Sequence, residues 1–276
     1  MGSERTNLGR AAPLTPYQIV SIAAAKQNPY CDNKPFSRTH AQAYANRLAD
    51  MSSEPPQPST AWPVDHEVSI QLSATVSLNG RLTIPERPVG IVLFAHGSGS
   101  SMHSPRNRFV ADILHSRRVA TLMFDLLTEH EAANRANVFD IELLAGRLIS
   151  ETSWVCHQPE TAGLPIGYFG ASTGAGAALW AAAEEGAEIK AVVSRGGRPD
   201  LAGDRLLKVG APTLLIVGGA DTHVIALNRK AAVALHCPVE VAIVPGATHL
   251  FEEPGTLRAA AELAGDWFQT HLVDHA

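Results

Sequence analysis

A serine at position 172 lies among small residues in Gly170-Ala171-Ser172-Thr173-Gly174, between a short apolar stretch and an Ala-rich stretch. This G-x-S-x-G pattern, between a predicted strand and a predicted helix, is typical of a sharp, strained turn that exposes the serine hydroxyl. The turn also aims the first amides of the helix at the site, so the Thr173 amide would stabilise a developing oxyanion. The pattern predicts that Ser172 is a nucleophile, whereas the alternative is a Gly-rich turn without chemistry.

His249 is the histidine best placed to activate this hydroxyl, because a serine needs a base within hydrogen-bonding reach. It lies in the Gly-containing segment 245–251, after the last predicted strand and before the last predicted helix. The imidazole needs a carboxylate to fix its tautomer, and we expect Asp221, which follows the predicted strand 213–217, to supply it. The alternatives are that Asp221 caps the following helix or that Asp200 is the acid. We expect Asp125 to be structural or to face the substrate.

A second Gly-rich segment, HGSGSS at 96–101, follows the predicted strand 90–95. Gly97 and Gly99 allow the backbone to turn its amides inward. We therefore expect the Ser98 amide to be the second oxyanion donor, and Gly97 and Gly99 to line the substrate site. A phosphate-binding interpretation is disfavoured because the lysine of G-x-x-x-x-G-K-[ST] is missing.

Arginines also fall near this predicted edge of the sheet. A guanidinium matches a carboxylate in shape and charge, so Arg106 and Arg195 are candidates for binding an anionic group of the substrate. The alternative is that the arginines of these segments brace the structure through ion pairs with neighbouring carboxylates. The residues concerned are Arg106, Arg108, Arg195 and Arg198, with Asp125, Asp200, Glu252 and Glu253.

Apolar strand-like runs alternate with helical patterns through most of the chain. This alternation predicts an α/β fold with a mainly parallel, doubly wound sheet and helices on both faces. Loops that follow the carboxyl ends of such strands carry the chemistry. We predict strands at 66–78, 81–84, 90–95, 119–124, 165–169, 189–193, 213–217 and 239–244, with a hairpin turn at Asn79-Gly80, and helices at 106–115, 138–154, 173–185, 223–235 and 257–271.

The first 60 residues differ from the rest. Segments 16–26 and 37–51 are predicted to form short helices, and the Ser- and Pro-rich segment 52–60 reads as a linker. We therefore predict an N-terminal helical extension over 1–60 and a main domain over 61–276. No long insertion separates the predicted strands 189–193 and 213–217, which indicates a modest pocket without an inserted lid. The extension is a candidate substitute lid.

The overall charge of −5 and the lack of a basic stripe argue against a nucleic-acid partner. The sequence contains no run of 18 apolar residues, so no membrane span is predicted. The first ten residues are polar and do not resemble a secretory signal. Three scattered cysteines show no disulfide pattern. We expect a cytoplasmic protein with a small-molecule substrate.

The motifs together resemble the α/β-hydrolase superfamily, and within it the dienelactone hydrolase-like group. The resemblance spans residues 65–273 and rests on HGSGSS at 96–101, GASTG at 170–174, SRGGRPD at 194–200, GGAD at 218–221 and PGATHLFEEPG at 245–255. It implies an α/β-hydrolase fold, the chain order Ser, Asp, His, and hydrolysis through an acyl-enzyme without metal or organic cofactor. One departure is that dienelactone hydrolases proper use a cysteine nucleophile, where this chain has Ser172.

We therefore expect a serine hydrolase that cleaves a small or medium carboxylic ester or lactone. An acyltransferase or thioesterase with the same three residues remains an alternative. A non-catalytic binding protein on the same fold is a further alternative.

Overall fold

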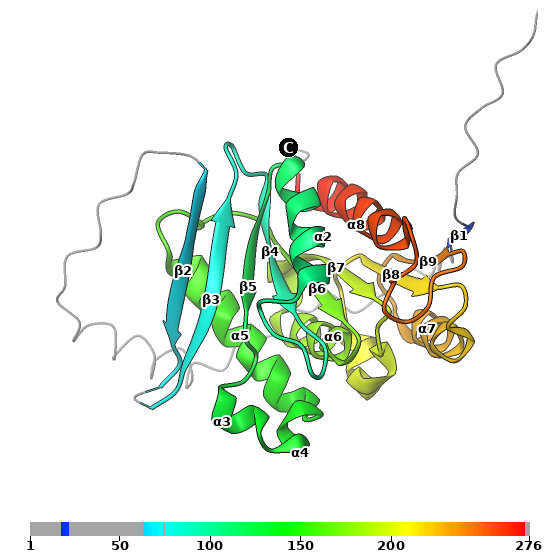
Figure 1. Ribbon diagram of the computed structural model, residues 1–276, viewed down its shortest axis with the longest axis horizontal. Helices are drawn as coiled ribbons and strands as arrows, with labels where there is room; N and C mark the ends of the chain where they lie inside the picture. Colours follow the sequence, from blue (N-terminus) through cyan, green and yellow to red (C-terminus); the bar gives the residue numbers. More distant parts are fainter. Residues whose placement is uncertain (1–17, 22–62, 74, 274–276) are drawn as a thin grey trace, which may run out of the picture.

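The computed structural model describes residues 18–21, 63–73 and 75–273, and the remainder is drawn in grey in Figure 1. The described residues form one 9-stranded sheet with the strand order β1-β9-β8-β7-β6-β4-β5-β3-β2. The neighbours from β9 to β5 pair in parallel, and the pairs at the two ends of the sheet are antiparallel. This arrangement is the α/β-hydrolase type of sheet that the sequence predicts.

The central strands are apolar runs that are buried on both faces, as the sequence pattern predicts. Every residue of β4, β5, β6 and β8 is buried. The bounds are β4 Gly90–Ala95, β5 Val119–Phe124, β6 Ile166–Ala171, β7 Ile189–Arg195, β8 Thr213–Gly218 and β9 Val239–Val244.

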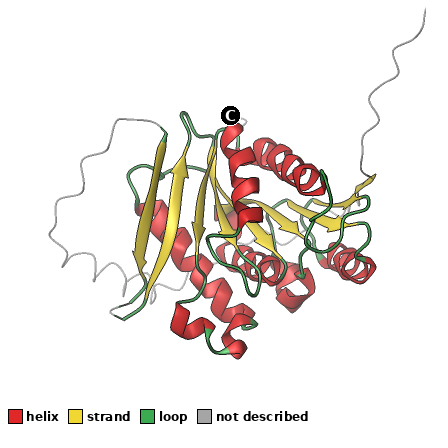
Figure 2. Ribbon diagram, viewed as in Figure 1, coloured by secondary structure: helices red, strands yellow, loops and turns green. Residues whose placement is uncertain are grey.

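Helices cover both faces of the sheet, as Figure 2 shows. Helices α2 (Pro105–Ser116) and α8 (Thr256–Leu272) pack together on one face. Helices α5 (Ile141–His157), α6 (Thr173–Glu185) and α7 (Thr222–Ala234) contribute to the apolar cluster on the other face. Two apolar cores therefore hold the sheet from both sides and fix the carboxyl ends of its strands.

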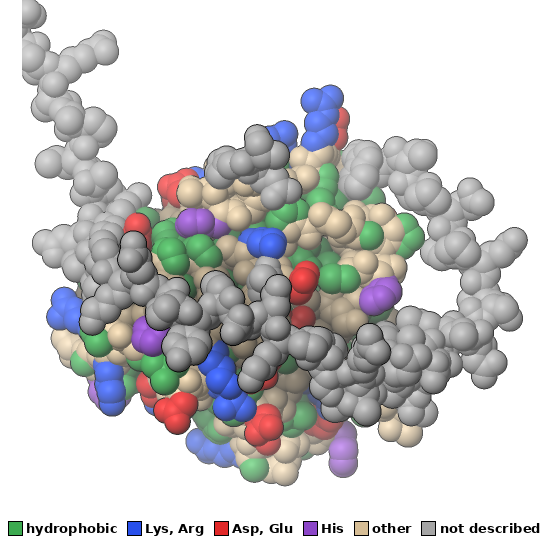
Figure 3. Space-filling view, turned by 180° about the vertical axis from the view of Figure 1, so that it is seen from behind, with side chains coloured by type: hydrophobic (Ala, Val, Ile, Leu, Met, Phe, Trp, Pro, Cys, Tyr) green, Lys and Arg blue, Asp and Glu red, His purple; other side chains and the backbone are tan. Residues whose placement is uncertain are grey.

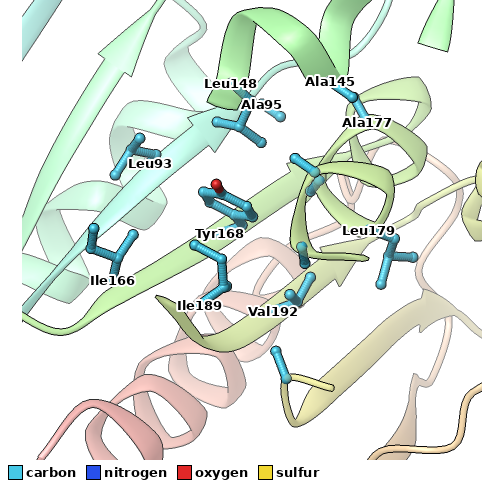
Figure 4. Close-up of a cluster of buried hydrophobic side chains, with 14 of the residues drawn as sticks. Leu93, Ala95, Ala145, Leu148, Ile166, Tyr168, Ala177, Leu179, Ile189 and Val192 are labelled. Carbon is cyan, nitrogen blue, oxygen red and sulfur yellow. The ribbon is translucent and has the colours of Figure 1, made fainter. Parts of the chain in front are cut away.

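Figure 4 shows the core between the sheet and helices α5 and α6, with Tyr168 of β6 at its centre. The Tyr168 side chain is fully buried, and its hydroxyl lies 2.6 Å from Thr152 Oγ1 of α5. Small residues such as Ala177 let α6 pack closely against this side. The helix that begins at the predicted nucleophile is thereby anchored to the sheet along its length.

The predicted hairpin turn at Asn79-Gly80 is wrong. Strands β2 (Val64–Gln71) and β3 (Ser77–Ile84) form the antiparallel hairpin, and both Asn79 and Gly80 lie inside β3. The turn lies at 72–76, where the Leu72 amide donates to the Val76 carbonyl. Gly80 serves close packing instead, because a Cβ there would lie 3.1 Å from Phe124 Cβ of the neighbouring strand.

The predicted N-terminal helix at 16–26 is also wrong where the structure describes it. Residues Gln18–Ser21 form strand β1, which pairs antiparallel with β9. The open backbone groups of β9 supply its partners. The second predicted helix, the linker and the lid role of the extension fall on residues outside the described ranges.

The other predicted elements of the main domain are confirmed, with small shifts at their ends. The helix predicted at 138–154 begins later, at Ile141, because Asp140 caps it through the Leu143 amide. Two short helices, α3 (Glu129–Ala132) and α4 (Arg135–Val138), precede it. The connection from β7 to β8 contains the 3-10 segments η2 (Pro199–Lys208), which pack against α6 and α7.

The surface opposite to the view of Figure 1 mixes both signs of charge. On the parts that Figure 3 does not draw in grey, acidic and basic side chains are interspersed rather than gathered into one stripe. None of the helices in the described ranges combines the length and the apolar character that a membrane crossing needs.

Candidate active site

Ser172 forms a sharp corner between the last residue of β6 and the first residue of α6. Its φ of 51° and ψ of −120° are rare for a residue with a side chain, so the corner is strained. The chain can make this corner only because small residues flank it. A Cβ on Gly174 would lie 2.1 Å from the Ala95 carbonyl oxygen, and one on Gly170 would lie 2.4 Å from Ala175 Cα. The corner presents the Ser172 hydroxyl beyond the carboxyl edge of the sheet.

The structure brings together the three residues that the sequence singles out. The Ser172 Oγ lies 3.3 Å from His249 Nε2, and His249 Nδ1 lies 2.8 Å from Asp221 Oδ2. With the Nδ1 proton donated to this carboxylate, Nε2 is the acceptor that faces the serine hydroxyl. The Asp221 side chain is 16% exposed and that of His249 is 38% exposed. The arrangement can therefore remove a proton from the hydroxyl and stabilise the imidazolium that results.

Asp221 fills both roles that the sequence left open. Its Oδ1 accepts a 3.4 Å hydrogen bond from the Val224 amide and caps α7, while its Oδ2 contacts the imidazole. The alternative acid, Asp200, makes a two-point ion pair with Arg198, at 2.9 and 2.8 Å. Asp125 accepts the Met102 amide at 2.7 Å and also lines a cavity beside the Gly-rich loop, so both of its predicted roles stay open. Asp221 is thus the carboxylate at the imidazole.

The loop that carries His249 is held by contacts that the sequence did not reveal. Gly196 adopts a φ of +52°, and a Cβ there would lie 2.9 Å from the His249 carbonyl oxygen. Thr248 donates from its amide and its hydroxyl to the two carboxylate oxygens of Glu253, at 3.0 and 2.7 Å. These bonds lower the pKa of Glu253 below its usual value. In the sequence, the paired glycines 196–197 and the spacing between Thr248 and Glu253 were the features that could have indicated these contacts.

The Gly-rich loop 96–101 lies against the serine corner, as the oxyanion interpretation requires. A Cβ on Gly97 would lie 3.0 Å from Ser172 Cβ, so only glycine allows this close approach. The Ser98 amide, however, donates to Thr173 Oγ1 at 2.9 Å. Its predicted role at an oxyanion therefore requires this amide to be shared with, or turned away from, the threonine hydroxyl. The Thr173 side chain was missed, since only its backbone amide was considered.

His96 anchors the start of the same loop. Its Nε2 accepts the Leu126 amide at 3.1 Å, and its Nδ1 lies 3.0 Å from the Gly97 carbonyl oxygen, to which it donates. Burial lowers the pKa of His96 below its usual value, which keeps the ring neutral for this pair of bonds. His96 and Asp125 together tie the loop to the end of β5.

Two cavities flank the Gly-rich loop. The smaller one, of about 230 Å³, is lined by both Ser172 and His249 and extends to Arg106, Asn107 and Arg195. The larger one, of about 540 Å³, lies toward β3 and α3, and its lining includes Met102, Thr128 and Thr173. Both contact Gly97 and Ser98, so the loop forms a wall between them.

The structure gives some of these arginines an acidic partner and leaves others without one among the described residues. Arg198 is bound to Asp200, and Arg108 is an exposed residue of α2. Arg106 lines the smaller cavity but pairs with Glu252 at 3.3 Å. Arg195 lines the same cavity and has no acidic partner among the described residues. Within those residues, no cluster of His, Cys, Asp and Glu has the arrangement of a metal site.

Comparisons with known proteins place this site in a family. Residues 118–272 match the sequence model of the dienelactone hydrolase family. The crystal structure of a dienelactone hydrolase from Anabaena variabilis is 54% identical and has a TM-score of 0.73, and the match covers 76% of this chain and 98% of that one. The chain belongs to the dienelactone hydrolase family.

More distant structures share the fold alone. Est1E from Butyrivibrio proteoclasticus is 15% identical with a TM-score of 0.64, over 74% of this chain and 98% of its own.

Proteins from two strains of Mycobacterium tuberculosis, named as phosphoribosyl transferases, are 57% identical over 237 residues. That match covers 86% of this chain and 52% of theirs, so this chain spans about half the length of these relatives.

Proposed function

We propose that the chain is a serine hydrolase that cleaves a small or medium carboxylic ester or lactone through an acyl-enzyme at Ser172. The observation that carries this proposal is the relay from Ser172 Oγ to His249 Nε2 and from His249 Nδ1 to Asp221 Oδ2. The family is one of hydrolases, which supports the same class of reaction.

In the first half of the reaction, His249 Nε2 takes the hydroxyl proton as Ser172 Oγ attacks the ester carbonyl carbon. The carbonyl oxygen becomes an oxyanion, and the amides of Thr173 and Ser98 donate to it. The tetrahedral intermediate then breaks the bond to the alcohol oxygen, which receives the proton from His249. The acid part of the substrate remains bonded to Ser172 Oγ as an ester.

In the second half, water enters and gives its proton to His249 Nε2 as its oxygen attacks the acyl carbon. Collapse of this intermediate breaks the bond to Ser172 Oγ, which recovers its proton from the imidazole. The acid is released and the free enzyme is restored. Asp221 remains ionised throughout and stabilises the imidazolium in both halves.

The two cavities support a substrate of modest size. A cavity of about 230 Å³ around Ser172 suits a short acid part, and the larger cavity beyond the Gly-rich loop suits another part of the substrate. The segments η2 between β7 and β8 pack on the helices beneath and leave the site without an inserted lid from that connection.

The test is labelling and turnover of one matched set of proteins. The wild type should hydrolyse short p-nitrophenyl esters, and a fluorophosphonate probe should attach to Ser172, as mapped by mass spectrometry. Ser172→Ala should lose both properties, whereas Ser101→Ala, in the neighbouring loop, should keep both. A label on another residue, or full activity of Ser172→Ala, would overturn the assignment.

An acyltransferase or thioesterase would use the same relay with a different acceptor or leaving group. Added alcohols or thiols that capture the acyl group faster than water would favour a transferase, and faster turnover of thioesters than of matched esters would favour a thioesterase. A binding protein without turnover is disfavoured because all three groups lie in bonding geometry. The cytoplasmic location and the small-molecule substrate belong to the same proposal.

A further inference from the structure

The Arg195 guanidinium at the end of β7 is buried without a compensating charge. The residue is 7% exposed, and no carboxylate of the described residues lies within ion-pair distance of it. Its Nη2 makes one long hydrogen bond, 3.4 Å, to Asn107 Oδ1, and its Nη1 has no hydrogen-bond partner. The guanidinium carbon lies 5.8 Å from the centre of the Phe169 ring, which adds a weak attraction.

Other shielded arginines of this chain are paired. Arg117, with 18% of its side chain exposed, bonds to Glu262 and Asp266 at 2.6 and 2.8 Å. Arg147, with 16% exposed, pairs with Glu131. Burial of a charged group without a partner is strongly unfavourable. Arg195 therefore stands out as a cation whose counter-charge is missing.

The charge remains on Arg195 at neutral pH. Burial, with a smaller contribution from the nearby Arg106, lowers the pKa of Arg195 to about 10. This value is still well above 7, so the side chain cannot avoid the unfavourable burial by losing its proton, as a buried lysine can. No carboxylate of the described residues offsets it, so an anion that enters the cavity would stabilise this charge.

The position of Arg195 indicates where that anion would lie. Arg195 lines the cavity of about 230 Å³ that also contains Ser172 and His249. Ser104 and Asn107, from the N-terminal end of α2, line it as well, and this end of a 12-residue helix carries partial positive charge. The acid part of an ester stays bonded to Ser172 Oγ after the alcohol leaves, so a cavity lined by Ser172 is suited to hold the acid part.

We propose that Arg195 binds a carboxylate on the acid part of the substrate, so that the enzyme prefers esters of short dicarboxylic acids over neutral esters of equal length. This inference rests on the proposed function, because it places the scissile carbonyl at Ser172. The carboxylate would accept from the Arg195 guanidinium and lie near the first turn of α2. The bound anion supplies the counter-charge that the described residues do not provide.

Two substrates that differ by one carboxylate test the preference. We expect wild-type kcat/KM, corrected for uncatalysed hydrolysis, to be at least about tenfold higher for p-nitrophenyl hemisuccinate than for p-nitrophenyl butanoate, since a charge-assisted bond is lost with the neutral ester. Arg195→Gln should reduce this ratio about tenfold or more. Arg195→Lys should restore part of the ratio. Arg108→Gln, which alters an exposed arginine of α2, should leave the ratio unchanged.

A binding measurement separates this inference from the proposed function. Succinate should raise the Tm of Ser172→Ala, and it should not raise the Tm of Ser172→Ala/Arg195→Gln. Equal ratios in wild type and Arg195→Gln, together with no shift by succinate, would overturn the inference while fluorophosphonate labelling of Ser172 still supported the hydrolase. Loss of labelling with a retained succinate shift would overturn the hydrolase and leave the anion site standing.

Discussion

Arg195, beside the nucleophile, and Glu151, inside α5, are both buried ionisable groups. Each has buried nitrogen or oxygen atoms that lack a hydrogen-bond partner. Glu151 is 0% exposed, and neither of its carboxyl oxygens has a hydrogen-bond partner. Burial raises its pKa to about 8, and the neighbouring Arg147 only partly opposes this. Arg195 has the same kind of environment but a pKa of about 10. At neutral pH, therefore, the carboxyl group of the core is mainly protonated and neutral, and the guanidinium at the cavity is charged.

The contrast shows that burial of an ionisable side chain can have two different consequences in one molecule. A carboxyl group relieves an unfavourable environment by binding a proton, which needs no further partner. A guanidinium keeps its proton, so its relief depends on an anion. Glu151 belongs to the helix packing of the domain, whereas Arg195 lines the cavity that contains Ser172. The same physical penalty is a matter of stability in one place and, on our proposal, of substrate choice in the other.

A second carboxyl group sharpens this contrast with the largest expected effect. Asp221 is partnered by His249, so Asp221→Asn should favour the wrong imidazole tautomer and lower kcat about 10,000-fold. Its thermal unfolding should change little by comparison. The matched variant is Asp200→Asn, which removes a carboxylate held by Arg198 rather than by the imidazole. Ester hydrolysis and Tm measured side by side check this, and similar losses of activity in the two variants would contradict the assignment.

Glu151→Gln should change stability and leave activity alone. The folded pKa, about 8, is above the ordinary value of 4.5, so the folded state holds a proton that the unfolded state releases. The stability of the wild type therefore falls as the pH rises from about 4.5 to about 8. Glutamine removes this loss, and at pH 7 the gain over wild type should reach up to about 3 kcal/mol.

Urea unfolding at pH 5 and pH 8 measures the effect of Glu151→Gln. The difference from wild type should be small at pH 5 and largest at pH 8. Glu142→Gln, on the exposed side of the same helix, is the control and should follow the wild type at both values. Parallel pH curves for wild type and Glu151→Gln would show that Glu151 is not a neutral group in the fold.

Arg195→Met should stabilise the free protein by about 1–2 kcal/mol, because it replaces a buried, unpaired charge with an apolar side chain of similar size. Arg117→Met should do the opposite and destabilise it, because it leaves Glu262 and Asp266 without their shared cation. Urea unfolding of both variants gives the comparison directly. A loss of stability in Arg195→Met as large as that in Arg117→Met would indicate that Arg195 is a structural group.

The sequence predicted most strands and helices of the main domain, because these depend on local signals, and it singled out the three residues that the structure brings together. Continuous apolar runs gave the buried strands, and the small residues around Ser172 gave the strained corner. Its two errors came from signals that tertiary contacts override. Asn79-Gly80 resembles a turn, but Gly80 packs closely against Phe124, and the segment Gln18–Ser21 pairs with the open edge of β9.

The sequence could not show which side chains become partners, because three-dimensional proximity decides this. Nothing local indicates that Arg195 lacks a carboxylate while Arg198, three residues later, has one. Likewise, the spacing of 75 residues between Ser98 and Thr173 gives no sign that a hydroxyl takes up the amide proposed for the oxyanion. Both features depend on which loops meet at the carboxyl edge, and both bear on catalysis.

The smallest expected effect concerns this hydroxyl, at the wall between the two cavities. Thr173→Val removes the acceptor for the Ser98 amide but keeps the shape of the side chain. If the hydroxyl positions the loop, the amide becomes less ordered and kcat should fall about three- to tenfold, with KM nearly unchanged. Thr173→Ser, which keeps the oxygen, should restore most of the rate.

Because a neutral ester and a hemisuccinate ester use the same oxyanion donors, both should lose the same factor in Thr173→Val. A loss confined to the hemisuccinate would instead tie Thr173 to the Arg195 side of the cavity, and a rate increase in Thr173→Val would mean that the hydroxyl withholds the amide from the oxyanion rather than positioning it.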